Sequence, residues 1–159
     1  MKKKEQFDLF VEISALLTGF SEPELWGTGM METYHDWLTT HCDADDLKYF
    51  FDLVSGILKD HKGKPDQIND AIRSIIMPAS TCNALAQKLI TLWYMGIWGT
   101  TPATPDWSAG GWVFAANAAP ISAESYIQGV VWNAGQTHPP GAKQPGFGSW
   151  GIPPVGALG

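Results

Sequence analysis

The C-terminal 64 residues of this 159-residue chain have almost no charge. From Gly96 to Gly159 the only charged side chains are Asp106, Glu124 and Lys143. Disordered tails are usually polar, charged and poor in aromatic residues. The scarcity of charge therefore argues against a free, solvated tail.

Basic residues are scarce in the chain as a whole. There are 10 Lys and Arg residues against 16 Asp and Glu residues, which gives a net charge of −6. The chain thus lacks the basic surface that attracts nucleic acids or anionic membranes, and we expect no nucleic-acid partner. The one basic cluster, residues 2–4, is interpreted as a solvated terminus.

Long apolar runs are also missing, and cysteines are few. No stretch of 18 apolar residues occurs, so we expect no direct membrane insertion. The N-terminus shows neither a secretory apolar region nor a twin-arginine pair. Cys42 and Cys82 are too few for a disulfide framework, and the sequence leaves open whether they pair.

The first part of the chain carries the signals of a helical bundle. Residues 1–95 hold 23 of the 26 charged residues. Gly19 is a natural helix stop, Ser21 and Glu24 form a capping box, and Asp43 is a good N-cap. We predict a mainly α fold, with a helical bundle over residues 1–98.

Apolar residues recur at helical spacing in this part, which predicts amphipathic helices. The four clearest stripes are Trp26, Met30, Tyr34, Trp37 and Leu38; Leu47, Phe50, Phe51, Val54, Ile57 and Leu58; Ile68, Ala71, Ile72, Ile75 and Ile76; and Leu85, Leu89, Leu92, Trp93 and Gly96. Pro78 is expected to end the third stripe, and Ser80 or Thr81 to cap the helix of the fourth.

Residues 99–159 are predicted to form an irregular arm rich in Trp, Gly and Pro. From Gly96 onward the chain holds five of its eight tryptophans, twelve of its seventeen glycines and eight of its eleven prolines. One short helix is expected near 122–132. Because the breakers prevent a periodic core and ordering the backbone costs entropy, we expect the arm to be ordered only against a partner.

Two patterns could indicate a cofactor or a metal, but flanking residues argue against the first and spacing argues against the second. Residues 146–151 match G-x-G-x-x-G, but prolines on both sides exclude the strand and helix that a dinucleotide site needs. His35 and His41 are six residues apart, which is the wrong spacing for a helical metal pair. We interpret them as surface histidines, and we expect no catalytic residue, cofactor or metal in this chain.

Three stretches carry a resemblance to a known family. They are residues 16–20 (LLTGF), residues 86–96 (AQKLITLWYMG), and residues 126–132 (YIQGVVW) together with the later residues 138–150 (HPPGAKQPGFGSW). With these stretches the chain resembles the small (gamma) subunit of FAD-dependent sugar and polyol dehydrogenase complexes, the sorbitol dehydrogenase small-subunit family.

The resemblance implies a role without chemistry. Small subunits of this family assist the folding, stability or export of a large subunit that binds FAD and oxidises a sugar or sugar alcohol. A membrane cytochrome c subunit commonly receives the electrons. The expected compartment is the periplasm, with the cytoplasm as the alternative since no twin-arginine pair is seen. Some relatives bond to the large subunit through a C-terminal cysteine, and this chain has none after Cys82.

Aromatic residues of the arm and of the helix before it are the expected partner contacts. They are Trp93, Tyr94, Trp98, Trp107, Trp112, Tyr126, Trp132, His138, Phe147 and Trp150. Buried aromatic residues are the commonest anchors of protein interfaces. The alternative from a different functional class is a free-standing carbohydrate-binding module that stacks sugars on the tryptophans of the arm.

Overall fold

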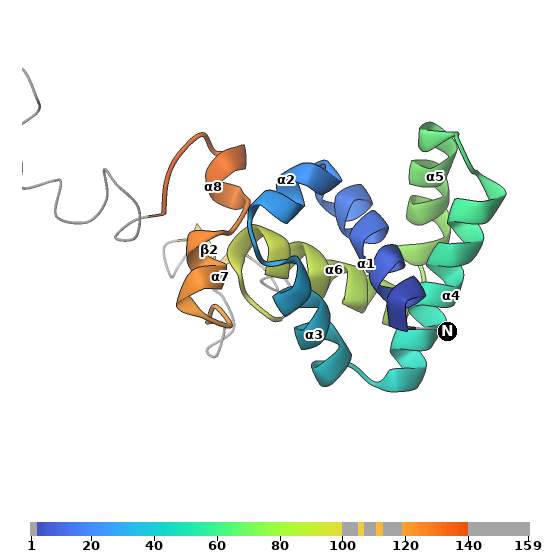
Figure 1. The fold of residues 1–159 in the computed structure, drawn as a ribbon, viewed down its shortest axis with the longest axis horizontal. Helices are drawn as coiled ribbons and strands as arrows, with labels where there is room; N and C mark the ends of the chain where they lie inside the picture. The colour runs from blue at the N-terminus through green and yellow to red at the C-terminus, as the bar shows by residue number, and fades with distance from the viewer. Residues whose placement is uncertain (1–2, 100–104, 107–110, 113–118, 140–159) are drawn as a thin grey trace, which may run out of the picture.

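The computed structural model describes residues 3–99, 105–106, 111–112 and 119–139, and in these residues the chain is mainly helical, as predicted (Figure 1). The elements are α1 (Lys3–Thr18), α2 (Glu22–Gly27), α3 (Met31–His41), α4 (Ala44–Asp60), α5 (Pro65–Ala71), the π-helix η1 (Ile72–Ile76), α6 (Ser80–Met95), β1 (Pro105–Asp106), β2 (Gly111–Trp112), α7 (Ala123–Ile127) and α8 (Val131–Ala134).

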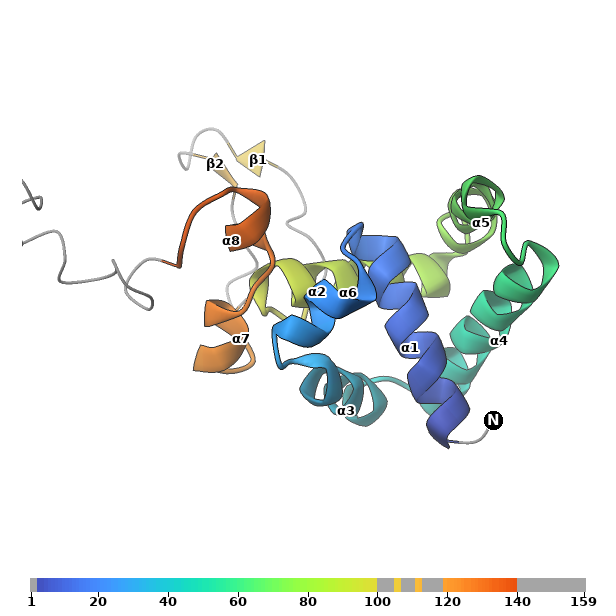
Figure 2. The ribbon, with the colours of Figure 1, turned by 45° about the horizontal axis from the view of Figure 1, so that its top comes forward.

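Helix α6 is the centre of the arrangement. It runs from the side where α4 and α5 lie to the side where α7 and α8 lie (Figures 1 and 2). Helix α1 packs on α6 and α4, and α7 and α8 contact the end of α6. The largest fully buried side chains are Trp93, Tyr34, Phe10, Phe50, Phe51, Ile13, Leu25, Met31, Leu38, Ile76, Leu89 and Leu92.

Several helix ends lie where their sequence signals place them. Gly19 ends α1 with a φ of 77°. The carboxylate of Asp43 accepts hydrogen bonds from the amides of Asp45 and Asp46 and so caps α4. At the start of α2, the Glu24 carboxylate accepts from the backbone amide of Ser21 at 2.8 Å, which is one half of the predicted capping box.

The second predicted helix is divided in two. Gly29 has a φ of 72°, a left-handed conformation that interrupts the helix between α2 and α3. As a result Trp26, on α2, is 44% exposed, while Met30 and Tyr34 are buried. We expected these residues on one face of a single helix, but the break at Gly29 separates Trp26 from Met30 and Tyr34.

The helices on either side of Pro78 also differ from prediction. The stripe that includes Ile72 and Ile75 passes from α5 into η1, and Ile75 is 43% exposed instead of buried. Neither Ser80 nor a later residue caps α6, because the extended backbone of Ala79 takes the N-cap position without a side-chain hydrogen bond.

The described residues after Gly99 form four short elements. β1 and β2 pair antiparallel, with Pro105 opposite Trp112 and Asp106 opposite Gly111. The single helix predicted near 122–132 is interrupted at residues 128–130 and forms α7 and α8. No helix in the described part of the chain is long and apolar enough to span a membrane.

Candidate functional site

Two distant parts of the chain are joined through Tyr94 near the C-terminal end of α6. Its hydroxyl donates a hydrogen bond to the carbonyl oxygen of Thr18 at 2.8 Å. Its ring meets the ring of Phe20 edge-on, with the centroids 6.1 Å apart. The last turn of α1 is thereby attached to the last turn of α6.

The segment 120–130 attaches to the same end of α6 through its backbone. The amide of Val130 donates to the carbonyl oxygen of Trp93 at 3.0 Å, and the amide of Ile121 donates to that of Gly96 at 2.8 Å. The hydroxyl of Ser125 donates to the Gly96 carbonyl oxygen as well, at 3.1 Å. These bonds satisfy carbonyl groups that the end of a helix leaves without intrahelical partners.

Two glycines permit this close approach. Gly96 has a φ of 70°, and a Cβ atom there would collide with the carbonyl group of Ser125. A Cβ atom at Gly129 would lie 2.6 Å from the carbonyl oxygen of Tyr94. Any larger residue at either position would push α7 away from α6.

Tyr34 supports the contact from the core side. It is fully buried, and its ring meets Trp93 edge-on at 4.8 Å. Burial, and then the charge of Glu124, raise the pKa of Tyr34 well above its usual range, so the hydroxyl stays protonated. It donates a long hydrogen bond of 3.5 Å to the Ser125 carbonyl oxygen. We call the contact of α1, α6 and residues 120–130 the α6 junction.

The first three expected interface residues, Trp93, Tyr94 and Trp98, are not buried to the same extent. Trp93 is 1% exposed and belongs to the core, so it offers no surface to a partner. This corrects our expectation, because Trp93 lies on the inward face of α6. Tyr94 and Trp98 are half-buried, and the Lys88 ammonium lies 5.4 Å from the centre of the Trp98 ring.

Tyr126 and Trp132 lie together beyond the junction. Both are half-buried, and their rings are 5.3 Å apart in an edge-on arrangement. The indole N–H of Trp132 donates to the Tyr126 carbonyl oxygen at 2.7 Å. His138 is exposed, the backbone of Trp112 pairs in β2, and Trp107, Phe147 and Trp150 lie outside the described residues.

A groove lies between α2 and the pair α7–α8, and we call it the α2–α8 groove. Its volume is about 310 Å³. It is lined by Glu24, Gly27, Thr28, Ile127, Gln128, Gly129, Trp132 and Asn133. Trp132, an expected interface residue, and Glu24, a charged residue of the bundle, therefore line the same groove.

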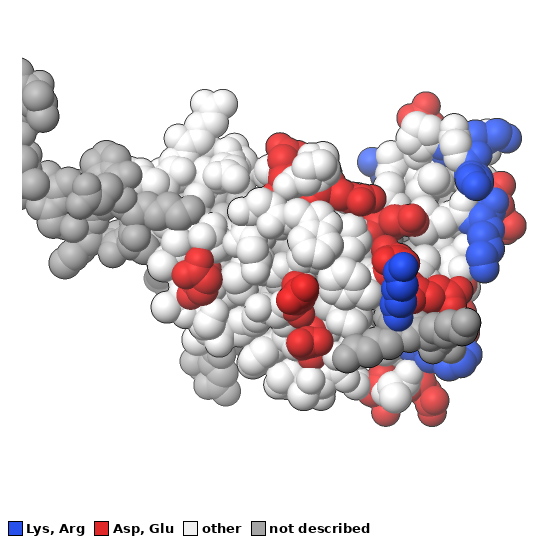
Figure 3. Space-filling view, viewed as in Figure 1, with Lys and Arg blue, Asp and Glu red and all other residues white. Residues whose placement is uncertain are grey.

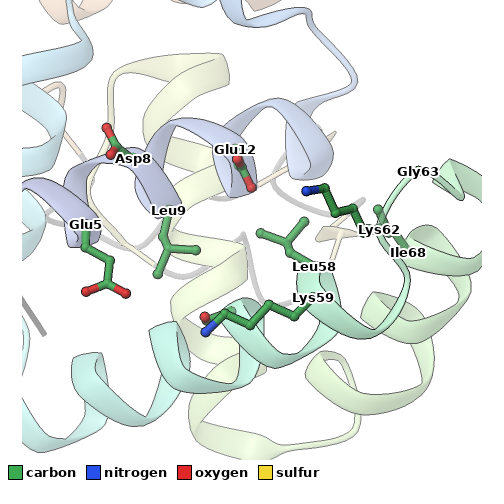
Figure 4. Close-up of a pocket in the computed structure, with 10 residues that line it drawn as sticks. Glu5, Asp8, Leu9, Glu12, Leu58, Lys59, Lys62, Gly63 and Ile68 are labelled. Carbon is green, nitrogen blue, oxygen red and sulfur yellow. The ribbon is translucent and has the colours of Figure 1, made fainter.

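A second hollow lies between α1, α4 and α5, with a volume of about 420 Å³ (Figure 4). Glu5 and Glu12 of α1 lie on the side of the lysines near the end of α4, whereas Asp8 points away from them. The lining residues are Glu5, Asp8, Leu9, Glu12, Ser55, Leu58, Lys59, Lys62, Gly63 and Ile68. Partial burial, then the charges of Glu22 and Asp8, raise the pKa of Glu12. The charged residues of this hollow are solvent-exposed, so we assign it no ligand.

The histidines and cysteines do not form a site in the described residues, which hold no group of three possible metal ligands. His41 lies at the surface, stacked on Trp37 at 3.9 Å. His35 corrects our expectation of a surface histidine: it is 3% exposed, because it lies on the inward face of α3 and packs edge-on against Phe7 and Phe10.

Cys42 and Cys82 are both free thiols. Burial raises the pKa of each thiol, so neither is activated as a nucleophile. The G-x-G-x-x-G match at 146–151 lies outside the described residues.

Charge is distributed unevenly over the surface. On the face in Figure 3, Lys and Arg side chains lie on the side of α1, α4 and the turn that follows α4, and they are missing over α2, α3, α7 and α8. The sequences of these last four helices contain no Lys or Arg, and their acidic residues are Glu22, Glu24, Glu32, Asp36 and Glu124. The part of the molecule that holds the α2–α8 groove is thus acidic.

Comparison of the chain with protein-family models, with curated proteins and with solved structures finds no match.

Proposed function

We propose that this chain is a non-catalytic small subunit of a flavoprotein sugar or sugar-alcohol dehydrogenase complex. In this role it assists the folding, stability or export of a large subunit, which holds FAD and the substrate. Electrons would pass from that subunit to a membrane cytochrome c subunit, and the complex would work in the periplasm.

One observation carries the proposal. Described parts of all three stretches in which the chain resembles the family, residues 16–20, 86–96 and 126–132, meet at the α6 junction. The contacts include Tyr94 with Thr18 and Val130 with Trp93. The meeting of the stretches supports the interpretation that they form one structural unit.

The placement of the aromatic residues also favours a partner. Tyr126 and Trp132 lie on the segment held by the junction, and part of each side chain remains accessible. A rigid support for partly exposed aromatic residues is what an interface anchor requires. The neighbouring surface of α2, α3, α7 and α8 carries acidic residues and no basic ones.

Co-purification tests this proposal. The full chain, with an affinity tag, is expressed together with an FAD-containing dehydrogenase large subunit from the same genome. We expect the flavin absorbance to co-elute with the tagged chain through affinity and size-exclusion steps. An unrelated FAD-containing enzyme, expressed in the same way, is the control for non-specific capture.

The opposite result is equally clear. A chain that elutes as a folded monomer, without flavoprotein, contradicts the proposal. If that monomer also shows saturable binding of neutral sugars by calorimetry, the chain is a carbohydrate-binding module instead.

A further inference from the structure

We propose that the α2–α8 groove receives an arginine or lysine side chain of the partner polypeptide. The inference rests on the proposed function, since it takes the occupant to be the partner subunit, and adds the chemistry of one contact in the complex.

The charged residue that lines the groove is Glu24. The backbone amide and the hydroxyl of Ser21 both donate to one of its oxygens, at 2.8 and 2.6 Å. The hydroxyl bond, followed by the amide bond, lowers the pKa of Glu24, so the group stays charged at neutral pH. The two bonds also hold the carboxylate in one place. A fixed negative charge with a remaining acceptor oxygen suits a guanidinium or ammonium group.

On the side of α8 the groove is lined by Trp132. Its hydrogen bond to the Tyr126 carbonyl and its edge-on contact with the Tyr126 ring fix its position. Trp is the aromatic side chain that attracts a cation most strongly. The aliphatic stem of Lys or Arg also packs well against such a surface while its charged end reaches a carboxylate.

The described residues supply no cation to this groove. None of the lining residues is Lys or Arg, and neither are any residues of α2, α3, α7 and α8. In the described residues the basic side chains belong to the N-terminal part of α1, to α4, to the turn that follows α4, to η1 and to α6. Charge complementarity therefore favours a cation from outside the described residues.

The size and polarity of the groove favour a side chain over a small molecule. Its volume of about 310 Å³ is at the lower end of the range for small-molecule sites, about 300–1,000 Å³. Half of its lining residues are polar side chains: Glu24, Thr28, Gln128 and Asn133. Small-molecule pockets are mostly apolar, whereas polar, partly wet rims are common at protein interfaces.

A neutral substitution that keeps the fold is available for the test. Glu24→Gln removes the charge, and Gln serves as well as Glu in a capping box. Glu22→Gln is the matched control, since Glu22 lies in the same helix but does not line the groove. Thermal melts of both variants establish that the helix is retained.

The probe is N-acetyl-arginine amide, added to the full ¹⁵N-labelled chain and followed by NMR. N-acetyl-citrulline amide, which has nearly the same shape without the charge, is the matched control ligand. We expect saturable shifts of the Trp132 indole N–H and the Gly129 amide with arginine and not with citrulline. Glu24→Gln should weaken the response about fivefold, the effect of one exposed ion pair, and Glu22→Gln should leave it unchanged.

Equal shifts with both ligands, no shifts with either, or an undiminished response in Glu24→Gln would overturn the inference. These titrations need no flavoprotein, so their failure leaves the proposed function standing. Failure of co-purification, in contrast, removes the proposed function even if arginine binds the groove.

Discussion

The Tyr94 hydroxyl donates a hydrogen bond of 2.8 Å to the Thr18 carbonyl oxygen, although the two residues are 76 positions apart. Thr18 is the last residue of α1, and its carbonyl belongs to the group that a helix end leaves without an intrahelical partner. The bond therefore joins the ends of two helices that also contribute the first two stretches of the family resemblance.

Removing this hydroxyl should lower the stability of the whole bundle. For Tyr94→Phe we expect a loss of about 1 kcal/mol in the free energy of unfolding, the usual net value of one hydrogen bond. Denaturant titration of the full chain measures it. Tyr49→Phe is the control, because Tyr49 is 54% exposed and should change nothing. Equal stability of both variants would show that the Tyr94 bond contributes nothing.

Gly96→Ala should damage the α6 junction more than its backbone conformation alone explains. Gly63 has a similar φ of 77°, but a Cβ atom there would meet nothing within 4 Å, so Gly63→Ala carries only the conformational cost, about 1 kcal/mol. At Gly96 the collision with Ser125 adds to that cost, and we expect a total of about 3 kcal/mol or more. Thermal melts of the two variants side by side isolate the difference.

Gly129→Ala gives a second view of the same contact, without a left-handed backbone. Its Cβ would lie 2.6 Å from the Tyr94 carbonyl oxygen, whereas a Cβ at Gly27 would meet nothing within 4 Å. Gly129→Ala should therefore destabilise the chain, and Gly27→Ala should be neutral or slightly stabilising. If both variants melt like the parent, residues 120–130 do not pack as described.

Hydrogen exchange should distinguish protected from unprotected amides within the arm. From the sequence alone, every amide from about Gly99 onward is expected to be unprotected without a partner. Because the amides of Ile121 and Val130 donate to carbonyls of α6, we expect these two to be protected in the isolated chain. NMR-detected exchange of the full chain gives the answer. Exchange of both amides at the rate of an unstructured peptide would show that the junction does not persist without a partner.

Neutralising Glu12 should stabilise the chain at neutral pH. Partial burial and the charges of Glu22 and Asp8 raise the pKa of Glu12 above its usual 4.5, so the folded state favours the protonated form. Its favourable contribution is present below the unfolded pKa and is lost as pH rises through the folded pKa. Glu12→Gln should thus melt higher than the parent at pH 7 and equally near pH 4.

The expected gain is below about 1 kcal/mol, because Glu12 is largely solvated and its interactions are screened. Glu5→Gln, in the same helix and the same hollow, is the comparison. A stabilisation by Glu12→Gln that persists unchanged at pH 4 would contradict the electrostatic explanation.

The helices could be predicted from the sequence because their signals are local. Asp43 caps α4 and Gly19 ends α1 through contacts within a few residues. His35 was missed although a signal was present, since it lies four residues after Met31 and three before Leu38, on the buried face of α3. Trp93 also lies on the apolar stripe of α6, and this position favoured a place in the core over a contact with a partner.

The α6 junction could not be predicted, because its contacts join residues far apart in the sequence. Gly96 and Ser125 are 29 residues apart, and Tyr34 and Ser125 are 91 apart. No local pattern pairs such residues. Gly96 was placed at the end of an apolar stripe and Gly129 inside the helix predicted near 122–132, whereas both glycines admit a neighbouring backbone.

The central claim is that this chain supports a flavoprotein without taking part in its chemistry, and one measurement tests it most directly. The large subunit is produced with and without this chain, and both its yield and its turnover per bound flavin are determined. We expect a several-fold higher yield of folded, flavin-loaded enzyme with the chain present, and the same turnover per flavin in both preparations. A many-fold rise in turnover when the chain is added late to pure, fully loaded large subunit, without any change in stability or aggregation, would contradict the account.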